Sequence, residues 1–517
     1  MERKLRRKKI IKNIFLFLGL FLIFFIISAS KWAVRYYGEI SFEEIIFQLF
    51  SPIVTTAGEA VDRFIYQVLI PALSYGVIFF IITKVFFKVI RDRDLIFGFT
   101  LRERNIRLRI PYLVLNYSMK ILIISVLFFN IYYSINRFGV FDYIKEQIFV
   151  STFIEENYVD PKSVEITSPA KKRNLIYLYV ESLESTYFSK NLGGGFDYNY
   201  MSGLTPLTKQ NTNFSNTDKF GGAVQIDKLG YTVAGIVAQT SGIPTKISSY
   251  AVNFNFFNYF LKGDYALAEI LKEDGYNQMF MMGSYKGFAN RDQYLEEHGD
   301  YDIYDYETAI EKGKIDEDYY VWWGFEDSKL FEYAKEEIKR LSKEDKPFNF
   351  SLLTTDTHAT DGYLESYCPI KYDDQLSNVI SCNVSDVAKL VYWIQKQDFY
   401  ENTTIVIVGD HLHMNNDYFE NIDENYERTV YNLFINSAIP DQNSKNRLFS
   451  TMDLFPTTLA SLGYTIDGDR LALGTNLYSG KKTLVEKYGK EKVDDEFEKK
   501  SEYYNQKIID GKEFKSK

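Results

Sequence analysis

Acidic side chains and a histidine follow directly after two apolar runs of this sequence. The run at 404–408 leads, after one glycine, into Asp410 and His411, and the run at 174–180 leads into Glu181. Ligands bind outside the carboxyl ends of the strands in an open α/β sheet, and carboxylate and imidazole groups bind divalent metals. If both runs are parallel strands, Glu181, Asp410 and His411 are therefore expected to share one divalent cation.

A hydroxyl group that such a cation could activate belongs to Thr232. This residue precedes the small-residue stretch at 234–238, which suits a closely packed helix. Backbone N–H groups at a helix N-terminus bind phosphate oxygens, and a bound metal lowers the pKa of a hydroxyl nucleophile. Thr232 is thus a candidate nucleophile for transfer through a covalent intermediate, and a plain helix N-cap is the alternative.

Besides His411, the sequence contains three histidines. His358 follows the apolar run at 348–354 and is therefore expected at the same edge of the sheet. His298 ends an acidic, helix-like segment, where a histidine interacts favourably with the helix dipole. His413 is expected to face solvent.

The elements that must position these residues alternate between two kinds of pattern. Apolar runs predict strands at 174–180, 278–282, 348–354 and 403–408. Amphipathic stretches predict helices at 265–273, 325–341 and 385–397. Strands that alternate with helices are typical of a parallel sheet covered on both faces. The expected fold class is therefore α/β, with a mixed, mostly parallel sheet.

Three apolar stretches precede these elements, at 10–28, 68–90 and 111–135. Each is close to the ~20 residues that a helix needs to cross a bilayer, so we expect three transmembrane helices. A cleaved signal peptide is the alternative for the first stretch, because small residues follow it at 28–30. The two later stretches would still hold the chain in the membrane.

Loop charges predict the orientation of these helices. The loop at 84–109 holds eight basic and three acidic residues, whereas the loop at 31–63 holds three basic and five acidic residues. Positions 1–12 hold seven basic residues. The positive-inside rule places the N-terminus and the 84–109 loop in the cytosol, which makes this a multi-pass protein of the cytoplasmic membrane. Everything after about residue 136 is then extracytoplasmic.

The length and charge of the chain limit its organisation and partners. With 517 residues it is too long for one ordinary domain. We expect a membrane domain at 1–137, a linker at 138–172, an extracytoplasmic domain at 173–480 and a charged C-terminal tail at 481–517. The net charge of −9 comes from the part after the basic N-terminus. An acidic domain lacks the basic face that nucleic-acid binding needs.

The sequence contains two cysteines, Cys368 and Cys382. Both belong to the part expected outside the cytosol, where disulfides form and persist. A disulfide between them and a pair of free thiols remain the two possibilities.

Five blocks of the sequence together carry a family resemblance. They are 174–188, 230–235 with 242–244, 291–292 with 323–327, 355–362 and 409–416. In this order they resemble the alkaline-phosphatase and sulfatase superfamily, and within it the phosphoglycerol transferases, which include phosphoglycerol transferase I and the lipoteichoic acid synthases. The blocks extend over nearly the whole domain that follows the membrane spans.

The resemblance implies a role for each matching residue in the metal site. Glu181, Thr232, Asp410 and His411 match the ligands of a single divalent metal, which is usually Mn²⁺ in lipoteichoic acid synthase. Mg²⁺ and Zn²⁺ remain possible cofactors. Thr232 matches the catalytic nucleophile, which attacks phosphatidylglycerol, releases diacylglycerol and holds glycerophosphate until an acceptor hydroxyl displaces it.

Two further matches concern the substrate. His358 matches a histidine that donates to the phosphate or to the leaving group, and Arg291 matches an arginine that contacts glycerophosphate. Lipoteichoic acid synthases carry a tryptophan two positions before that arginine, where this chain has Ala289, and they have five membrane spans. These departures favour transfer to an extracytoplasmic glycan over synthesis of a polyglycerolphosphate chain.

Several other functions are alternatives to this one. A lipoteichoic acid synthase, a phosphoethanolamine transferase and a phosphodiesterase with water as the acceptor would use the same fold. A sulfatase would need a Cys/Ser-x-Pro-x-Arg motif, and Thr232 is followed by neither proline nor arginine in that pattern. A membrane-anchored binding module with a structural metal is the non-enzymatic alternative, but structural zinc sites favour four Cys or His ligands.

Overall fold

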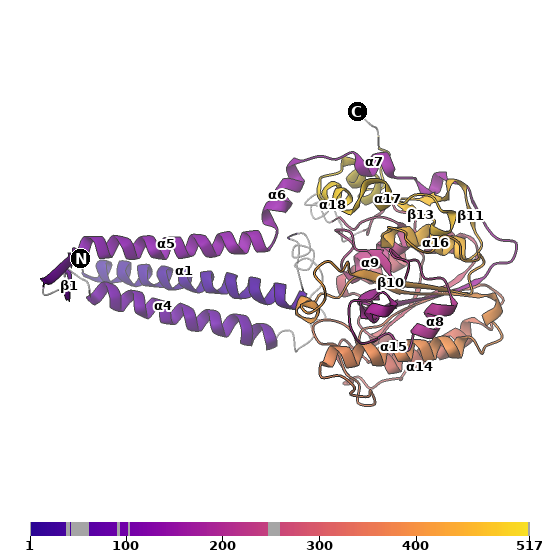
Figure 1. Cartoon of the computed structure of the whole chain (residues 1–517), viewed down its shortest axis with the longest axis horizontal. Coiled ribbons are helices and arrows are strands. Elements are labelled where there is room, and N and C mark those ends of the chain that lie inside the picture. Colours follow the sequence, from indigo (N-terminus) through magenta and orange to yellow (C-terminus); the bar gives the residue numbers. More distant parts are fainter. Residues whose placement is uncertain are drawn as a thin grey trace. The chain divides into compact units, whose positions relative to one another are not determined.

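The computed structural model describes residues 2–37, 42, 62–89, 94–101, 104–246 and 259–514. The chain forms two compact units (Figure 1). Of the described residues, those up to 141 belong to the N-terminal unit and those from 142 onward belong to the C-terminal unit.

Three helices in the described part of the N-terminal unit are long and apolar enough to cross a membrane. The candidate spans are Arg6–Arg35, Asp62–Val89 and Tyr112–Arg137. They correspond to helix α1 (Glu2–Tyr37), to the π-helix Ile65–Leu69 with α4 (Ile70–Val89), and to α5 (Tyr112–Arg137). The three predicted stretches therefore form helices of the expected length and apolarity.

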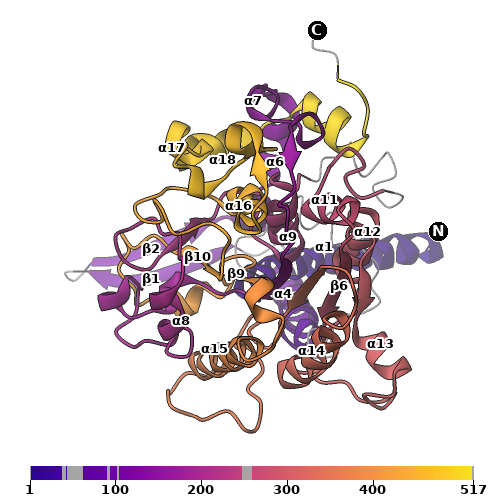
Figure 2. The same ribbon diagram turned by 90° about the vertical axis from the view of Figure 1, so that its right-hand side faces the viewer.

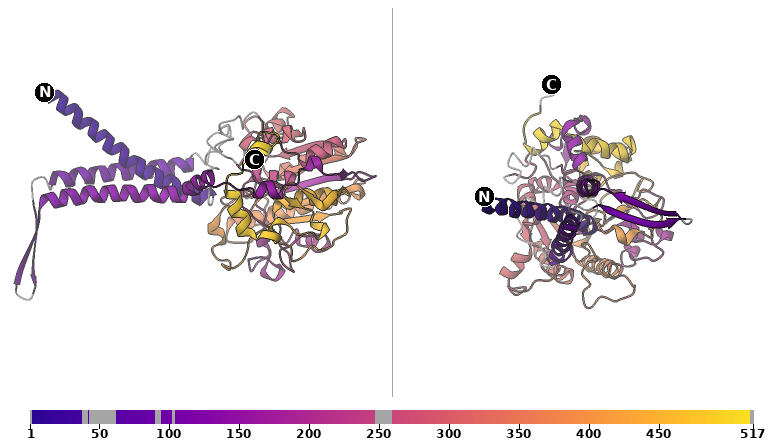
Figure 3. Two further views of the ribbon diagram at one scale, coloured as in Figure 1. Left: turned by 90° about the horizontal axis from the view of Figure 1, so that it is seen from above. Right: turned by 90° about the vertical axis from the view of Figure 1, so that its left-hand side faces the viewer.

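A β-hairpin that the sequence patterns did not indicate lies between α4 and α5. Strand β1 (Leu95–Leu101) pairs antiparallel with β2 (Arg104–Ile110). Figure 3 shows the hairpin as two purple arrows at the end of the helices, running crosswise to them.

The C-terminal unit is built around a seven-stranded sheet with the order β5-β10-β9-β4-β8-β6-β7. The strands are β4 (Asn174–Val180), β5 (Gly222–Val224), β6 (Asn277–Met282), β7 (Asp302–Tyr304), β8 (Phe348–Leu353), β9 (Thr403–Gly409) and β10 (Thr429–Ile435). Strand β4 is parallel to β8 and β9, and β6 is parallel to β7 and β8, whereas β10 is antiparallel to β5 and β9. The sheet is mixed and mostly parallel, which confirms the predicted fold class and all four predicted strands.

The central strands are buried on both faces, which explains their continuous apolar sequences. In β4, Leu175 and Tyr177 belong to one core cluster, whereas Ile176 and Leu178 belong to the other. This alternation follows from the two-residue period of a strand. Each strand end therefore emerges between two packed layers.

Helices cover both faces of the sheet, as predicted (Figure 2). One layer includes α9 (Thr232–Ser241), α11 (Leu267–Glu273), α12 (Arg291–Glu297) and α16 (Leu454–Ser461), and the opposite layer includes α14 (Asp327–Leu341) and α15 (Gln375–Ile394). Smaller elements are α8 (Thr205–Gln210) and α13 (Tyr306–Glu311), with two-residue strands β3 (Ile166–Thr167), β11 (Thr465–Ile466), β12 (Arg470–Leu471) and β13 (Gly474–Thr475). Cys368 and Cys382 form a disulfide with a Cα–Cα distance of 5.7 Å, which ties the segment after β8 to α15.

Most of the residues after 480, which we expected as a charged tail, are helical. This segment forms α17 (Leu484–Tyr488), α18 (Lys490–Glu498) and the π-helix Tyr504–Ile509. Val493, Phe497, Tyr504 and Ile508 are buried in the core. Sparse apolar residues four positions apart form one stripe on a helix, and that stripe is buried here although charged residues surround it in the sequence.

The predicted linker also packs onto the C-terminal unit. It contains α6 (Val140–Ile148) and α7 (Phe153–Asn157), whose Phe153 and Ile154 are buried. The Ser151 amide donates to the Lys500 carbonyl at 2.8 Å, and β3 pairs with β11. The partners of this segment thus come from the far end of the chain, which local sequence patterns do not reveal.

Candidate metal and nucleophile site

Parallel pairing of β4 and β9 brings the predicted metal ligands together. Val180 lies opposite Gly409 in the register, so Glu181 and Asp410 leave the sheet at the same level. Glu181, Asp410 and His411 are buried, and one potential ligand atom from each lies within 4.8 Å of the others.

The hydrogen bonds of His411 orient it toward the two acids. Its Nδ1 lies 2.8 Å from the Leu412 carbonyl. A carbonyl only accepts, so Nδ1 carries the proton and Nε2 is left to act as a ligand. Nε2 lies 3.5 Å from Glu181 Oε1 and 3.4 Å from Asp410 Oδ2. These distances exceed those of good charge-assisted hydrogen bonds, about 2.7–2.9 Å.

The negative charges of Glu181 and Asp410 are not offset by an ion pair with a lysine or arginine among the described residues. Burial and the nearby Glu181 raise the pKa of Asp410 to about 7. Although burial alone lowers the pKa of His411, Asp410 and Glu181 outweigh it and raise that pKa.

Asp410 leaves one oxygen for a further ligand. Its Oδ1 accepts hydrogen bonds from the Ser182 amide at 2.8 Å and the His411 amide at 2.9 Å. Its Oδ2 is buried and has no hydrogen-bond partner. Two carboxylates, one of which has an oxygen without a hydrogen-bond partner, and an imidazole fit a divalent cation. The charge of the cation would offset the cost of burying both acids.

Thr232 lies beside this cluster as the first residue of α9. Its Oγ1 is 3.4 Å from Glu181 Oε2 and 3.5 Å from His411 Nε2. The N-cap position of α9 is occupied by Tyr231. The alternative that Thr232 is only an N-cap is therefore wrong, and its hydroxyl faces the acids and the histidine.

Two residues that the sequence analysis missed bring α9 against the end of β9. A Cβ added at Gly235 would lie 2.2 Å from the Asp410 carbonyl oxygen, so only glycine permits this close approach. Gln239 donates to the Gly409 carbonyl at 2.9 Å and accepts from the Tyr177 hydroxyl at 3.0 Å. The small-residue stretch after Thr232 was the sequence signal for the close approach at Gly235. No local pattern indicates the hydrogen bonds of Gln239.

His358 follows β8, at the expected edge of the sheet. Its Nδ1 lies 3.1 Å from the Ala359 carbonyl, so Nδ1 carries the proton and Nε2 has the free lone pair. Burial lowers the pKa of His358 to about 4, which leaves the ring neutral near pH 7. In this state Nε2 accepts a proton rather than donating one.

Arg291 is a buried cation at the start of α12. It donates to Ser284 Oγ at 3.0 Å and to the carbonyls of Tyr285 and Phe288 at 2.7 and 3.1 Å. Burial lowers the pKa of its guanidinium to about 10. The negative charges of nearby acids, of which Glu181 has the largest effect, act to raise this pKa. Within the described residues no acid pairs with Arg291, so its charge is available to an anion.

The expectation that His413 faces solvent is wrong. His413 is buried, its Nδ1 accepts from the Asn415 amide at 3.0 Å, and burial lowers its pKa to about 3. Its backbone N–H donates to Glu184 Oε1 at 2.7 Å, and Glu184 forms a buried ion pair with Arg428. This ion pair anchors the segment that follows the candidate metal site. Local sequence patterns do not predict it, because its two residues are far apart in the sequence.

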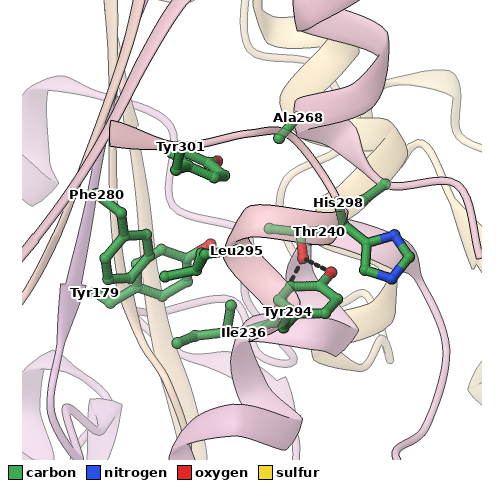
Figure 4. A pocket seen from close by; sticks show the side chains of 10 residues that line it. Tyr179, Ile236, Thr240, Ala268, Phe280, Tyr294, Leu295, His298 and Tyr301 are labelled. Atoms are coloured by element: carbon green, nitrogen blue, oxygen red, sulfur yellow. Dashed lines mark hydrogen bonds between the residues drawn. The ribbon is translucent and has the colours of Figure 1, made fainter. Parts of the chain in front are cut away.

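His298 belongs to a different part of the fold. It lines a small, mainly aromatic cavity with Tyr179, Tyr294 and Tyr301 (Figure 4). Tyr294 bonds through its hydroxyl to Thr240 Oγ1 at 2.6 Å. None of the residues that line this cavity belongs to the metal cluster.

Comparison with known proteins places this geometry in a family. The sulfatase family model matches residues 173–464, more than half of the chain, so the chain belongs to the sulfatase family. This confirms the resemblance seen in the five sequence blocks.

One similar protein is phosphoglycerol transferase I of Salmonella choleraesuis (strain SC-B67), which is 31% identical over 325 residues. The match covers 61% of this chain and 40% of that protein, so the chain spans well under half the length of this relative. Similar solved structures include the lipoteichoic acid synthase LtaP from Listeria monocytogenes (17% identity, TM-score 0.48, 63% of this chain and 81% of that chain). Another is the Streptococcus pyogenes phosphoglycerol transferase GacH with sn-glycerol-1-phosphate (17% identity, TM-score 0.39, 59% and 76%).

Proposed function

We propose that this protein is a membrane-anchored phosphoglycerol transferase that moves glycerophosphate from phosphatidylglycerol to an extracytoplasmic glycan. One observation carries the proposal: the Thr232 hydroxyl lies at a helix N-terminus beside the buried group of Glu181, Asp410 and His411. Similarity to proteins named phosphoglycerol transferase I supports the choice of the transferred group.

In the first half of the reaction, Thr232 Oγ1 forms a bond to the phosphorus of phosphatidylglycerol as it loses its proton. The bond between phosphorus and the diacylglycerol oxygen breaks, and diacylglycerol leaves once that oxygen gains a proton. Thr232 then holds glycerophosphate as a phosphate diester. A covalent intermediate divides one transfer between bulky partners into two simpler displacements.

In the second half, an acceptor hydroxyl attacks the same phosphorus and the bond to Thr232 Oγ1 breaks. His358 Nε2 is the proton acceptor for that hydroxyl, because its lone pair is free and the ring is neutral. The donor role that the resemblance implies for His358 belongs to the first half, in which the same nitrogen gives a proton to the leaving diacylglycerol oxygen. Thr232 recovers a proton and is ready for the next cycle.

Charges around the phosphate are placed to stabilise it. The N–H groups of the first turn of α9 bind phosphate oxygens, and Arg291 supplies a buried positive charge. Glu181, Thr232, Asp410 and His411 would hold a divalent cation, Mn²⁺ by preference or else Mg²⁺ or Zn²⁺, which lowers the pKa of the hydroxyl and offsets phosphate charge.

Aromatic rings beside His358 support a sugar as the acceptor. The Trp323 ring lies 4.7 Å from the His358 ring and 5.5 Å from the Phe288 ring, and Trp322 stacks on Tyr363 at 6.4 Å. The electron-rich faces of aromatic rings attract positively polarised C–H groups, which line one side of a pyranose. The acceptor hydroxyl would then approach from the side of these rings.

The test uses the full-length protein in vesicles that contain fluorescent phosphatidylglycerol and Mn²⁺. We expect diacylglycerol release by the wild type and a loss of about 10³-fold or more in Thr232→Ala. Mass spectrometry should find a glycerophosphoryl group on Thr232 when no acceptor is present. Thr205→Ala is a matched control, because Thr205 is also the first residue of a helix, α8, and should leave release unchanged.

The other outcomes separate the alternatives. Release that persists in Thr232→Ala contradicts the covalent route and indicates direct attack by water. Release from phosphatidylethanolamine but not from phosphatidylglycerol would identify a phosphoethanolamine transferase. Formation of a polyglycerolphosphate chain would identify a lipoteichoic acid synthase.

A further inference from the structure

The hairpin of β1 and β2 has one apolar face. Its register pairs Leu95 with Ile110 and Phe97 with Leu108. Side chains directly opposite each other, and those two positions apart along a strand, share a face of a sheet. These four side chains, with Phe99, therefore form a single apolar surface, which we call the apolar face of the hairpin.

The opposite face has a different character. Ile96 lies opposite Arg109, and Gly98 lies opposite Arg107. Both arginines are exposed, as is Ile96. The hairpin thus presents a row of apolar side chains on one side, and two guanidinium groups with Ile96 on the other.

The apolar face is not covered by the rest of the described chain. Leu95, Phe97, Phe99 and Leu108 are 41%, 50%, 51% and 51% exposed. An isolated two-stranded hairpin is at best marginally stable in water. A surface of this size on so small an element therefore needs a partner.

The base of the hairpin is fixed at the start of α5. Asp94 Oδ1 accepts from the backbone N–H of Tyr112, the first residue of α5, at 2.9 Å. Asp94 Oδ2 accepts from Arg109 Nε at 2.6 Å. Only Pro111 separates β2 from α5, and at ~3.3–3.6 Å per residue the end of β2 lies within roughly 7 Å of the helix start.

The direction of the hairpin matches a membrane surface. Both views of Figure 3 show it crosswise to α4 and α5 at one end of these helices. An element that lies across the end of a membrane span runs parallel to the plane of the bilayer. Its seven-residue strands reach roughly 20 Å along that plane.

Positive charge is concentrated at the same end of the helices. The segment 84–109 holds eight basic and three acidic residues, and positions 1–12 hold seven basic residues. Lys84 donates to Asn13, so α1 contacts α4 about three turns after its own start. An anionic membrane surface attracts lysine and arginine side chains that lie close to it.

We propose that the β1–β2 hairpin is an interfacial membrane anchor. Its apolar face enters the boundary between lipid headgroups and acyl chains, and Arg107 together with the surrounding basic residues binds anionic lipid phosphates. A membrane fits better than a protein partner, because both ends of the hairpin continue into candidate spans and its long axis follows the bilayer plane. This inference is independent of the reaction proposed above.

The test compares neighbouring residues on the two faces in the full-length protein. Cys368 and Cys382 are bonded to each other, so a cysteine introduced into the hairpin is the one free thiol. Phe97→Cys and Leu108→Cys label the apolar face with an environment-sensitive fluorophore, and Gly98→Cys labels the other face. A Cβ at Gly98 meets no atom within 4 Å, so this variant should fold normally.

The labelled proteins are placed in vesicles of phosphatidylcholine with phosphatidylserine, an anionic lipid that is not the proposed substrate. We expect quenching by lipid-borne nitroxide to be about twofold or more stronger at positions 97 and 108 than at position 98. Equal quenching on both faces, whether strong or weak, would overturn the proposal. So would a difference between the faces that appears only after a soluble protein is added.

A charge variant tests the role of the anionic lipid. Arg107→Gln should lower quenching at position 97 in vesicles with phosphatidylserine and have little effect in pure phosphatidylcholine. Lys396→Gln removes one exposed positive charge from the C-terminal unit and serves as the control. If quenching at position 97 with Arg107 intact does not depend on phosphatidylserine, a contribution of anionic lipid is excluded and the anchor is apolar only.

Discussion

Two groups in the C-terminal unit each combine a buried histidine with two acids, and they differ in what the histidine can still bind. His411 lies with Glu181 and Asp410, whereas His298 lies near Glu269 and Asp264. Burial raises the pKa of Asp410 to about 7 and that of Asp264 to about 6. Composition and burial alone therefore do not distinguish a metal site from a structural one.

The hydrogen bonds make the distinction. His298 Nδ1 lies 3.1 Å from Glu269 Oε2, and its Nε2 lies 2.6 Å from the Phe260 carbonyl. Both partners accept, so both ring nitrogens carry protons and neither has a lone pair for a metal. His411 uses one nitrogen on a carbonyl and turns the other toward two acids and the Thr232 hydroxyl. A histidine with a free nitrogen at a sheet edge is the better candidate ligand.

The largest difference between the groups should appear in activity. His411→Asn removes a proposed metal ligand and should lower diacylglycerol release more than about 100-fold. His298→Gln should leave release within about threefold, because it does not touch the substrate. The measurement is an initial rate under matched protein and Mn²⁺ concentrations. Comparable losses in both variants would contradict the assignment of separate roles.

Metal binding should stabilise the protein through the group that contains His411, and not through the group that contains His298. Mn²⁺ at about 100 times its Kd should add about 2.7 kcal/mol to the free energy of unfolding. The increase should be retained in His298→Gln and lost in Asp410→Asn. Without metal, Asp410→Asn should be as stable as the wild type or more so, because it removes a buried charge that Glu181 opposes. Thermal melts with Mn²⁺ and with a chelator measure both effects.

The group that contains His298 should stabilise the fold. His298→Ala removes the hydrogen bonds of the imidazole to the Phe260 carbonyl and to Glu269 and should lower the free energy of unfolding by about 1.5–3 kcal/mol. Urea denaturation measures this loss. His358→Ala is a useful control, because it removes a half-buried neutral histidine whose ring bonds to its neighbour's carbonyl. A smaller loss for His298→Ala than for His358→Ala would argue against the structural role.

The smallest effect concerns pH. Although burial alone lowers the pKa of His298, the hydrogen bond to Glu269 and the charge of Asp264 outweigh it and raise that pKa above 6.5. The stabilisation by His298 is thus complete below about pH 6.5 and is lost as pH rises through the folded-state value. Each unit of raised pKa corresponds to about 1.4 kcal/mol. The destabilisation by His298→Gln should be larger at pH 6 than at pH 9; the opposite trend would contradict this assignment.

The candidate metal site was predictable from the sequence, because residues that follow neighbouring parallel strands lie close together at one edge of the sheet. Two apolar runs that each end in an acid must place those acids at one sheet edge if the runs pair in register, as β4 and β9 do. The packing of residues 142–172 and 481–514 was not predictable in this way. Phe153 and Phe497 are buried against each other at 6.2 Å, although more than 300 residues separate them in the sequence.

The sequence by itself determined the α/β class, four of the seven strands of the central sheet, the apolar helices and the acids and histidine of the candidate metal site. Periodicity and strand-end residues encode these features locally. Only the tertiary structure decided that Thr232 faces the cluster, that His413 is buried and that both nitrogens of His298 are occupied. These properties depend on contacts such as those of Gly235 with Asp410 and Glu184 with Arg428, and a local pattern carries no information about a distant partner.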